Sequence, residues 1–219
     1  MGSRALAVAC VLKTGAWHNG MHRSEYRAEH VQLLRRQVSK HLTLPHRFVC
    51  LSDVQIEGVE TIPLTQGWPG WWNKIELFQH DLGRLLYLDL DTVIVGSLND
   101  LVSRSHRFTA LQALSRDQGR CLNSGLMAWE GRRLDIFERF RAAPDRYMRQ
   151  CRVRGNWGDQ GFINGHVGHW DAWQEIFPGR VVSYKLHLKQ RLPPPPGTSV
   201  VCFHGKPRPW EVSHSWVPR

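Results

Sequence analysis

The chain of 219 residues predicts an α/β domain with a mostly parallel central sheet. In its first half, short apolar runs rich in β-branched residues alternate with stretches of helical periodicity. A strand, a helix and a second strand in succession imply parallel neighbours joined by a right-handed crossover. The length fits one domain with a substantial core, and no repeat or clear linker divides it. We therefore expect a single domain over residues 1–219.

The first half supplies the elements of this sheet in order. Apolar residues predict a strand over Ala5–Leu12, and the polar loop Lys13-Thr14-Gly15 follows it. Ser24 is placed to cap a helix that runs to about Lys40 on one apolar stripe. The next expected elements are a strand at Arg47–Leu51, a short strand near Val59–Ile62, a helix from about Trp71 to His80 and a strand at Leu85–Leu88.

The second half is less regular. Its patterns predict helices over Gly131–Arg141 and Asp159–Val167. The tetraproline run Pro193–Pro196 predicts a stiff rim loop within the same domain. The strands expected here are Phe108–Ala113, Gly125–Trp129, Val181–Tyr184 and Val200–Phe203.

Composition limits the function classes. The apolar stretch Ala5–Leu12 is far shorter than the roughly 20 residues that span a bilayer. It also lacks the basic region and cleavage pattern of a secretory signal, so we expect an intracellular, cytoplasmic protein. The cysteines are odd in number and form no CxxC pair, which favours reduced core thiols over disulfides or a zinc site. They are Cys10, Cys50, Cys121, Cys151 and Cys202.

The charge and the tryptophans point to possible ligands. Lys and Arg exceed Asp and Glu by 29 to 19, which favours an anionic partner such as a phosphorylated substrate or the inner face of an anionic membrane. Because the basic residues are dispersed without a known motif, no sequence-specific nucleic-acid partner is expected. Trp68, Trp71 and Trp72 form one cluster, and Trp170 and Trp173 another. Most should be core residues, while some could offer faces to sugar rings or a uracil base.

Two acids, Asp89 and Asp91, interrupt the apolar segment from Arg84 to Val95. Side chains i and i+2 of an extended chain point the same way, and ligands of open α/β sheets bind beyond the carboxyl ends of strands. The pair could therefore hold a hard divalent cation together with a third ligand or a substrate phosphate. The structural alternative is a turn cap, in which Thr92 extends a local hydrogen-bond pattern.

Further clusters could complete such a site. Lys74, on the helix before the acidic strand, could meet a phosphate or simply face solvent. Asp159 and the amide of Gln160 stand at an expected helix start, where Asp159 could also be a cap. After the last strand, His204 could ligate a metal and Lys206 could neutralise a leaving diphosphate, although His204 alone would be an ordinary turn residue.

In sequence order, these clusters resemble the motifs of GT-A glycosyltransferases, and most of all those of the glycogenin-like family 8. The resemblance covers about residues 5–210 and implies a Rossmann-like GT-A domain, with a nucleotide-binding part at about 1–95 and an acceptor side at about 96–219. The matching residues are the DxD of Asp89 and Asp91, Asn123-Ser124-Gly125, Gly158-Asp159-Gln160, His204-Gly205-Lys206-Pro207, and Lys74 fifteen residues before the first aspartate.

The resemblance implies a metal and diphosphate site. Asp89, Asp91 and His204 would bind Mn²⁺ or Mg²⁺, and Asp89 would face the donor diphosphate through the metal. Gly205 and Lys206 would contact the diphosphate directly. The family pattern has additional residues within this motif that His204-Gly205-Lys206 lacks. Of the implied contacts, that of Lys206 is therefore the one that matches the family pattern least.

The resemblance also implies a sugar pocket. Asn123, Asp159 and Gln160 would line it as the catalytic group, with Lys74 nearby as a donor-binding residue. The Lys13-Thr14 loop occupies the position that binds the nucleotide base, but its residues match the family poorly, and UDP is favoured on the likeness alone.

The implied reaction moves a hexose from a UDP-sugar to a glycan, lipid-linked or protein acceptor, with retention at the anomeric carbon. Retention can proceed through a covalent intermediate, for which Asp159 is the natural nucleophile, since the amide of Gln160 is a feeble one. It can also proceed by same-face attack, in which the leaving phosphate takes the acceptor proton. The sequence leaves both routes open.

Rival classes remain. Asp89-Leu90-Asp91-Thr92-Val93 also satisfies the nucleophile motif of haloacid-dehalogenase-type phosphatases, but that motif normally lies near the chain start and needs a later pair of metal-binding acids. A nucleotidylyltransferase would need a Gly-rich phosphate loop, which Ala5–Gly20 lacks. A non-catalytic carbohydrate-binding or membrane-associated module, with a structural cation at the acids, is the third alternative.

Overall fold

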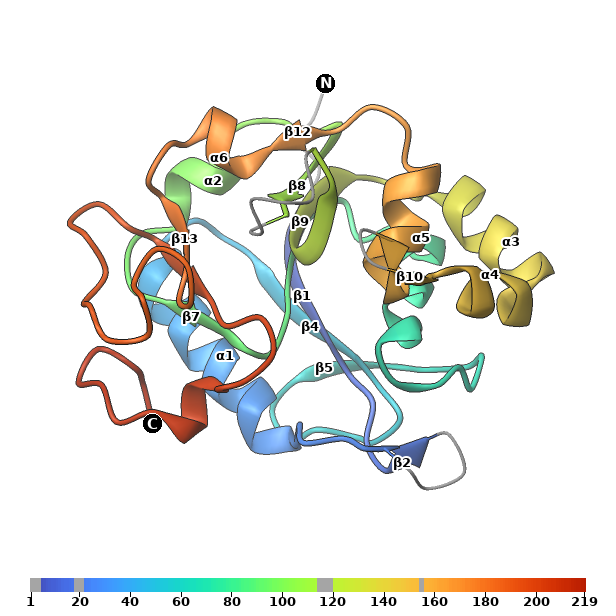
Figure 1. The fold of residues 1–219 in the computed structure, drawn as a ribbon, viewed down its shortest axis with the longest axis horizontal. Helices are drawn as coiled ribbons and strands as arrows, with labels where there is room; N and C mark the ends of the chain where they lie inside the picture. The colour runs from blue at the N-terminus through green and yellow to red at the C-terminus, as the bar shows by residue number, and fades with distance from the viewer. Residues whose placement is uncertain (1–4, 18–21, 114–119, 154–155) are drawn as a thin grey trace.

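The structure is a computed structural model that describes residues 5–17, 22–113, 120–153 and 156–219. At its centre lies a seven-stranded sheet with the order β12-β8-β9-β6-β1-β4-β5 (Figure 1). Its strands are β1 (Leu6–Leu12), β4 (Arg47–Ser52), β5 (Glu60–Pro63), β6 (Arg84–Leu88), β8 (Phe108–Gln112), β9 (Leu122–Glu130) and β12 (Asp171–Ala172). Neighbours pair in parallel except at β9, which runs antiparallel to β6 and β8. The predicted mostly parallel α/β sheet is confirmed.

Helices cover both faces of this sheet (Figure 1). The α-helices are α1 (Ala28–His41), α2 (Asn99–Ser103), α3 (Leu134–Ala142), α4 (Pro144–Gln150), α5 (Gly158–His166) and α6 (Trp173–Ile176), and the 3-10 helices are η1 (Gly70–Gln79) and η3 (Pro209–Glu211). Helices α1, α2 and α6 contribute to one hydrophobic core, and η1, α3 and α5 contribute to the other. No helix within the described ranges is long and apolar enough to cross a bilayer.

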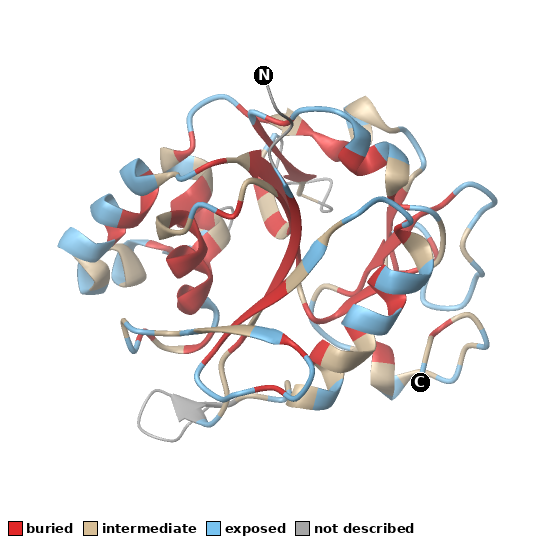
Figure 2. Cartoon of the chain, turned by 180° about the vertical axis from the view of Figure 1, so that it is seen from behind, coloured by how far each residue is buried: buried red, intermediate tan, exposed pale blue. Residues whose placement is uncertain are grey.

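The alternation of side chains along β1 separates the two cores. Val8 and Cys10 pack with the buried face of α1, whereas Ala7 and Ala9 join the aromatic core under η1, α3 and α5. Figure 2 shows the resulting band of buried strands through the middle of the molecule. Four of the five cysteines are buried, and none of the five, all of which lie in the described ranges, forms a disulfide.

A second sheet of three strands determines which loops meet at the site. Its strands are β7 (Thr92–Ile94), β13 (Val181–Ser183) and β14 (Val200–Cys202), in the order β13-β14-β7. Strand β14 pairs antiparallel with β7 and places Cys202 opposite Thr92. The backbone N–H of Phe203 then donates to the carbonyl oxygen of Asp91 at 3.2 Å. This pairing brings the chain after β14 beside the acids after β6.

Two short hairpins complete the description: β2 (Ala16–Trp17) pairs with β3 (His22–Arg23), and β10 (Arg152–Val153) pairs with β11 (Asn156–Trp157). Helices α2, α4 and α6 are short elements that the sequence patterns did not predict. Each has seven residues or fewer, which is too short for an amphipathic period to stand out.

One predicted detail was wrong, and one predicted helix is present but is of the 3-10 type. Ser24 is not the cap of the first helix, which begins at Ala28 after Arg27. Instead, the Ser24 hydroxyl accepts the N–H of Tyr26 at 3.2 Å, and the Arg27 N–H donates to Nδ1 of His30 at 3.0 Å. The expected helix from Trp71 is a 3-10 helix, η1.

A side chain holds the backbone at the start of η1. The Nδ2 atom of Asn73 donates to the carbonyl oxygens of Trp68 and Gly70 at 2.6 and 2.7 Å. The side chain thereby satisfies carbonyls at the helix start that backbone N–H groups would otherwise take. These contacts were not visible in the apolar periodicity.

Candidate active site

A cavity of about 420 Å³ opens where β1, β6 and β14 end and where β9 and α5 approach them. Its position beyond the carboxyl ends of parallel strands is the usual ligand position of open α/β sheets. The predicted site residues that line it are Lys13, Lys74, Asp89, Asp91, Asn123, Asp159, Gln160, His204, Gly205 and Lys206. Thr14, the remaining predicted residue, is not part of its lining.

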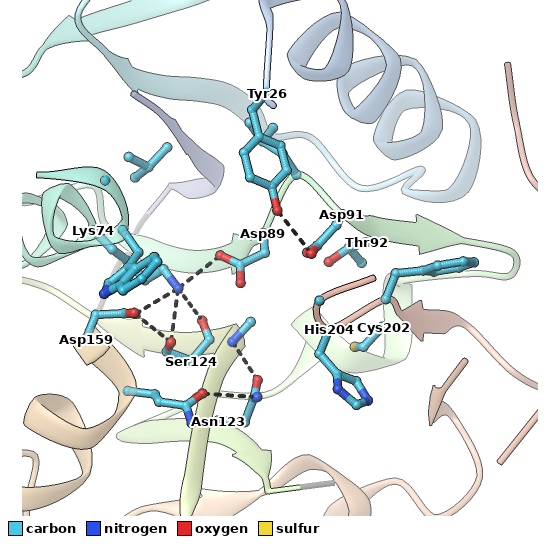
Figure 3. Close-up of a pocket in the computed structure, with 18 of the residues that line it drawn as sticks. Tyr26, Lys74, Asp89, Asp91, Thr92, Asn123, Ser124, Asp159, Cys202 and His204 are labelled. Carbon is cyan, nitrogen blue, oxygen red and sulfur yellow. Dashed lines mark hydrogen bonds and ion pairs between the residues drawn. The ribbon is translucent and has the colours of Figure 1, made fainter. Parts of the chain in front are cut away.

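Lys74 is the centre of a buried ionic cluster in this cavity (Figure 3). Its Nζ lies 3.0 Å from Oδ1 of Asp89 and 2.9 Å from Oδ2 of Asp159. It also donates to the Ser124 hydroxyl at 3.0 Å, and that hydroxyl donates to Asp159 Oδ2 at 2.6 Å. Burial alone would lower the pKa of Lys74, but the charges of Asp159 and Asp89 raise it above its ordinary value. Lys74 is therefore an ammonium that holds two carboxylates together.

Asp89 follows β6 and is fixed from several sides. Its backbone N–H donates to the carbonyl oxygen of Gly125 at 2.9 Å, and its Oδ1 accepts the phenolic O–H of Tyr87 at 2.5 Å. A Cβ added to Gly125 would lie 3.3 Å from Oδ2 of Asp89, tighter than an ordinary contact. The glycine of the Asn-Ser-Gly motif therefore keeps the space beside this carboxylate free of a side chain.

Asp91 is the more deeply buried of the two acids. Its Oδ2 accepts the O–H of Tyr26 at 3.1 Å and an N–H of Arg208, with which it forms an ion pair. Burial and the negative charge of Asp89 raise the pKa of Asp91 to about 7, and the Arg208 guanidinium opposes part of that rise. Additional positive charge would therefore stabilise the ionised forms of these two carboxylates.

His204 lines the same cavity, and Figure 3 shows it with Asp91 on one side of Asp89 while Lys74 and Asp159 lie on the other. Its Nε2 forms a 2.7 Å hydrogen bond with the hydroxyl of Ser183. Burial, with the nearby cation Lys185, lowers the pKa of His204 to about 4, so the imidazole is neutral at physiological pH. A neutral imidazole is the form that ligates metals.

The described residues contain no group of three His, Cys, Asp or Glu side chains arranged to hold a metal ion. Asp89 and Asp91 are two oxygen donors at one strand end, and His204 points to Ser183. The acids suit a hard cation, provided that other oxygens complete its shell.

The second half of the cavity carries amides. Nδ2 of Asn123 donates to Oε1 of Gln160 at 3.2 Å, and Oδ1 of Asn123 accepts the N–H of Gly125 at 2.9 Å. Strand β9 and helix α5 thus present Asn123, Asp159 and Gln160 together, as the motif order predicted. Asn123 and Ser124 lie inside β9, which is longer than the expected strand.

The predicted cation Lys206 stands at the rim. Its side chain is 64% exposed and pairs with Glu25 at 2.9 Å and Glu211 at 3.0 Å. Arg208, two residues later, is the cation that enters the cavity, where its guanidinium pairs with Asp91 and lies 5.1 Å from the ring centre of Tyr26.

The predicted base-binding loop, Lys13 and Thr14, contacts the side chain of Asp53. Nζ of Lys13 pairs with Oδ2 of Asp53 at 2.6 Å. The N–H and hydroxyl of Thr14 donate to the two Asp53 oxygens at 2.9 and 3.0 Å. Asp53 follows β4 just as the loop follows β1, so parallel pairing brings them together.

Sequence reasoning missed Tyr26, Ser124 and Arg208 as members of the site. Ser124 belongs to the Asn123-Ser124-Gly125 motif but had no assigned role, and the second basic residue of Lys206-Pro207-Arg208-Pro209 was a signal that could have identified Arg208. No local pattern marks Tyr26, because its contact with Asp91 joins residues 65 positions apart.

Comparison with known proteins places the fold. No protein-family model and no curated protein sequence matches this chain. Among solved structures, the galactosyltransferase LgtC in complex with donor and acceptor sugar analogues matches with a TM-score of 0.62 and 15% identity, over 93% of this chain and 89% of that chain. The glycosyltransferase GlyE of Streptococcus pneumoniae TIGR4 matches with a TM-score of 0.56 and 13% identity, over 95% of this chain and 56% of that chain. The chain has the GT-A fold.

The bifunctional glycosyltransferase WbbM is a further match, with a TM-score of 0.58 and 10% identity, over 94% of this chain and 47% of that chain. The chain therefore spans most of LgtC but only about half of GlyE and WbbM. At these identities the likeness establishes the GT-A fold, which confirms that prediction. Membership of family 8 stays a prediction.

Proposed function

We propose that this chain is a metal-dependent glycosyltransferase that moves a hexose from a UDP-sugar to a hydroxyl acceptor with retention of configuration. The supporting observation is the convergence of Asp89, Asp91, Lys74 and Asp159 in the cavity of a GT-A fold. The matching structure of LgtC holds donor and acceptor sugar analogues, which supports a sugar acceptor as well as a sugar donor for this chain. UDP rests on the motif likeness alone.

Asp89 and Asp91 would hold Mn²⁺ or Mg²⁺, and diphosphate oxygens and water would complete the shell. Their mutual repulsion in a confined cavity supports a cation there. His204, neutral and in the same cavity, is the proposed third protein ligand. A divalent cation bound by these residues would spread the charge that develops on the leaving diphosphate.

Arg208 would be the main protein cation for the diphosphate. It lines the cavity beside Asp91, whereas Lys206 is mostly exposed and already paired with two glutamates. A guanidinium presents several donors in one plane and suits phosphate oxygens. We assign Lys206 to the rim, where it orders the loop through Glu25, and Gly205 to the backbone that approaches the diphosphate.

Asn123, Asp159 and Gln160 would bind the transferred hexose, next to Lys74. Asp159 is the only carboxylate that α5 contributes to the cavity lining, yet its Oδ2 is tied to Lys74 and to the Ser124 hydroxyl. These contacts stabilise its charge and reduce its nucleophilicity. They favour same-face attack, in which Asp159 positions and stabilises the sugar and the diphosphate accepts the acceptor proton.

The donor assay tests the proposal. Purified protein is incubated with UDP-glucose, UDP-galactose, UDP-N-acetylglucosamine and GDP-mannose, with Mn²⁺ or with EDTA, and the released nucleoside diphosphate is measured. We expect metal-dependent release from a UDP-hexose that Asp91→Asn abolishes. Asp145→Asn, on the exposed α4, is the matched control and should behave as wild type. Hydrolysis of sugar phosphates without any nucleoside diphosphate release would instead establish the phosphatase alternative.

The route is tested separately. Intact-protein mass spectrometry during turnover should show no glycosyl adduct on the enzyme if attack occurs on the same face. A hexose adduct that maps to Asp159 and disappears in Asp159→Asn would contradict that route and establish the covalent one.

A further inference from the structure

Two tryptophans with exposed indoles, Trp71 and Trp157, line the cavity. Their side chains are 43% and 53% exposed, while Trp72, adjacent to one of them, is buried in the aromatic core. The two indoles add apolar surface to a cavity that also carries charged and amide side chains. Both indoles therefore present exposed surface to the cavity.

Trp71 is presented by a rigid segment. Trp72 stacks on Phe140 with ring centres 5.0 Å apart and an interplanar angle of 15°. On the other side, Asn73 binds the carbonyl oxygens of Trp68 and Gly70. These contacts fix the backbone on both sides of Trp71, so ordering its ring on a ligand costs little conformational entropy.

Gly158 lies between Trp157 and Asp159 in the sequence and packs against Trp71. It has a φ of +61°, and a Cβ placed on it would lie 2.8 Å from Nε1 of Trp71. The backbone between Trp157 and Asp159 thus packs directly on the Trp71 indole. Trp157 is two residues before Asp159 in the sequence, and both indoles line the same cavity as Asp159, which belongs to the proposed sugar pocket.

The chemistry at this end of the cavity suits an uncharged polar ring. Lys74 is the cation here, and its ammonium already contacts Asp89 and Asp159. Asn123 and Gln160 add amide donors and acceptors. A flat apolar face beside a few oriented amides is how proteins bind a pyranose, with C–H bonds on the ring face and hydroxyls on the amides.

We propose that Trp71 and Trp157 form a stacking platform for a saccharide acceptor, an inference that rests on the proposed transferase function for the acceptor's role. A donor consists of base, ribose, diphosphate and hexose in that order. If the diphosphate binds at Asp89, Asp91 and Arg208 and the hexose binds at Asp159, the base would lie on the far side of the diphosphate from Asp159. The platform therefore meets the group that attacks the hexose, rather than the uracil.

Kinetics of substituted proteins test the platform. Maltose, lactose, cellobiose and methyl hexosides are first tested for acceleration of UDP release by the wild type, and the most effective saccharide is used. Trp71→Ala and Trp157→Ala should each raise the KM for that saccharide, and this rise should exceed any rise in the donor KM by about ten-fold or more. Trp157→Phe, which keeps an aromatic face, should recover most of the loss.

Val153→Ala is the matched control. Val153 lies on the same hairpin as Trp157, is 59% exposed and is not part of the cavity lining, so its substitution should leave both KM values unchanged. A rise in the donor KM with an unchanged saccharide KM in the two alanine variants would overturn the proposal and make the indoles a base platform. Unchanged values for both substrates would overturn it as well.

Glycan binding without a donor separates this inference from the proposed function. Wild type and variants are applied to an immobilised glycan array in the absence of nucleotide sugar. Binding by the wild type and by Val153→Ala, with loss in Trp71→Ala and Trp157→Ala, would support the platform even if no nucleotide sugar turned over. No binding by the wild type combined with wild-type transfer kinetics in both alanine variants would overturn it while leaving the transferase intact.

Discussion

Replacement of Lys74 by methionine should destabilise the folded protein strongly. The side chain of Lys74 is 6% exposed and lies about equally close to Asp89 and Asp159, at 3.0 and 2.9 Å. Methionine fills a similar volume but leaves the buried Asp159 and the partly exposed Asp89 without their shared cation. The perturbation therefore removes charge compensation and little packing.

The magnitude follows from these distances. Unit charges about 3 Å apart attract by about 5 kcal/mol at an effective dielectric constant of 20. Desolvation offsets part of this in the intact protein, but removal of one partner from a buried pair typically costs about 3–5 kcal/mol, because the other partner stays buried and unpaired. Asp89 is 33% exposed and recovers some hydration, which places Lys74→Met at the lower end. For a chain of this length, the loss corresponds to a fall in Tm of about 6–12 °C.

Urea unfolding followed by circular dichroism, together with thermal melts, measures the effect. Lys40→Met is the control, because Lys40 is exposed in the last turn of α1, and it should change the unfolding free energy by about 0.5 kcal/mol or less. The double variant Lys74→Met with Asp159→Asn should be more stable than Lys74→Met alone, since one uncompensated charge is removed. A loss below about 1 kcal/mol in Lys74→Met, without recovery in the double variant, would refute the reasoning.

Three further predictions concern the donor and the backbone. Arg208→Ala should weaken UDP binding in Mn²⁺ about ten-fold by titration calorimetry, whereas Lys206→Ala should change it about two-fold or less, because its exposed ion pairs contribute little. Removal of the metal with EDTA should weaken UDP binding by wild type at least about ten-fold, and equal affinity in EDTA would count against a metal at the acids. Gly158→Ala should lower the unfolding free energy through a positive φ, about 1–2 kcal/mol, and through the clash with Trp71, about 1–3 kcal/mol more. Gly179 is the control: its φ is +77°, but a Cβ on it would meet nothing within 4 Å, so Gly179→Ala should show only the cost of the positive φ. If urea unfolding gives the same loss of unfolding free energy for Gly158→Ala and Gly179→Ala, the clash with Trp71 is relieved.

Much of the fold was predictable because its signals are local. The strands predicted at Ala5–Leu12, Arg47–Leu51 and Leu85–Leu88 correspond to β1, β4 and β6 of the central sheet. Period-two alternation and strand length follow from backbone geometry, which any segment carries by itself. Ser24 failed as a cap because a side chain that can cap a helix can equally close the turn before it.

The candidate site was predictable as a set of motifs and only partly as a set of contacts. Residues near Asp89, Asn123, Asp159 and His204 do line one cavity, as their order predicted. Their partners were not visible in the sequence, because ion pairs and hydrogen bonds between distant segments leave no local period. The assignment of the tryptophans is the same case: composition predicted many aromatic residues, but not which of them lie in the cavity.

The sequence by itself determined that two carboxylates, Asp89 and Asp91, follow a buried strand, although Leu90 and Asp91 form a turn instead of the extended chain that was expected. Only the tertiary structure decided what surrounds them. The antiparallel pairing of β14 with β7 sets the register that brings Arg208 to Asp91 and leaves Lys206 at the rim. The packing of η1 against α3 buries Trp72 and leaves its neighbour Trp71 exposed beside α5. Residue order determines which side chains are present, whereas strand register and helix packing determine which of them meet.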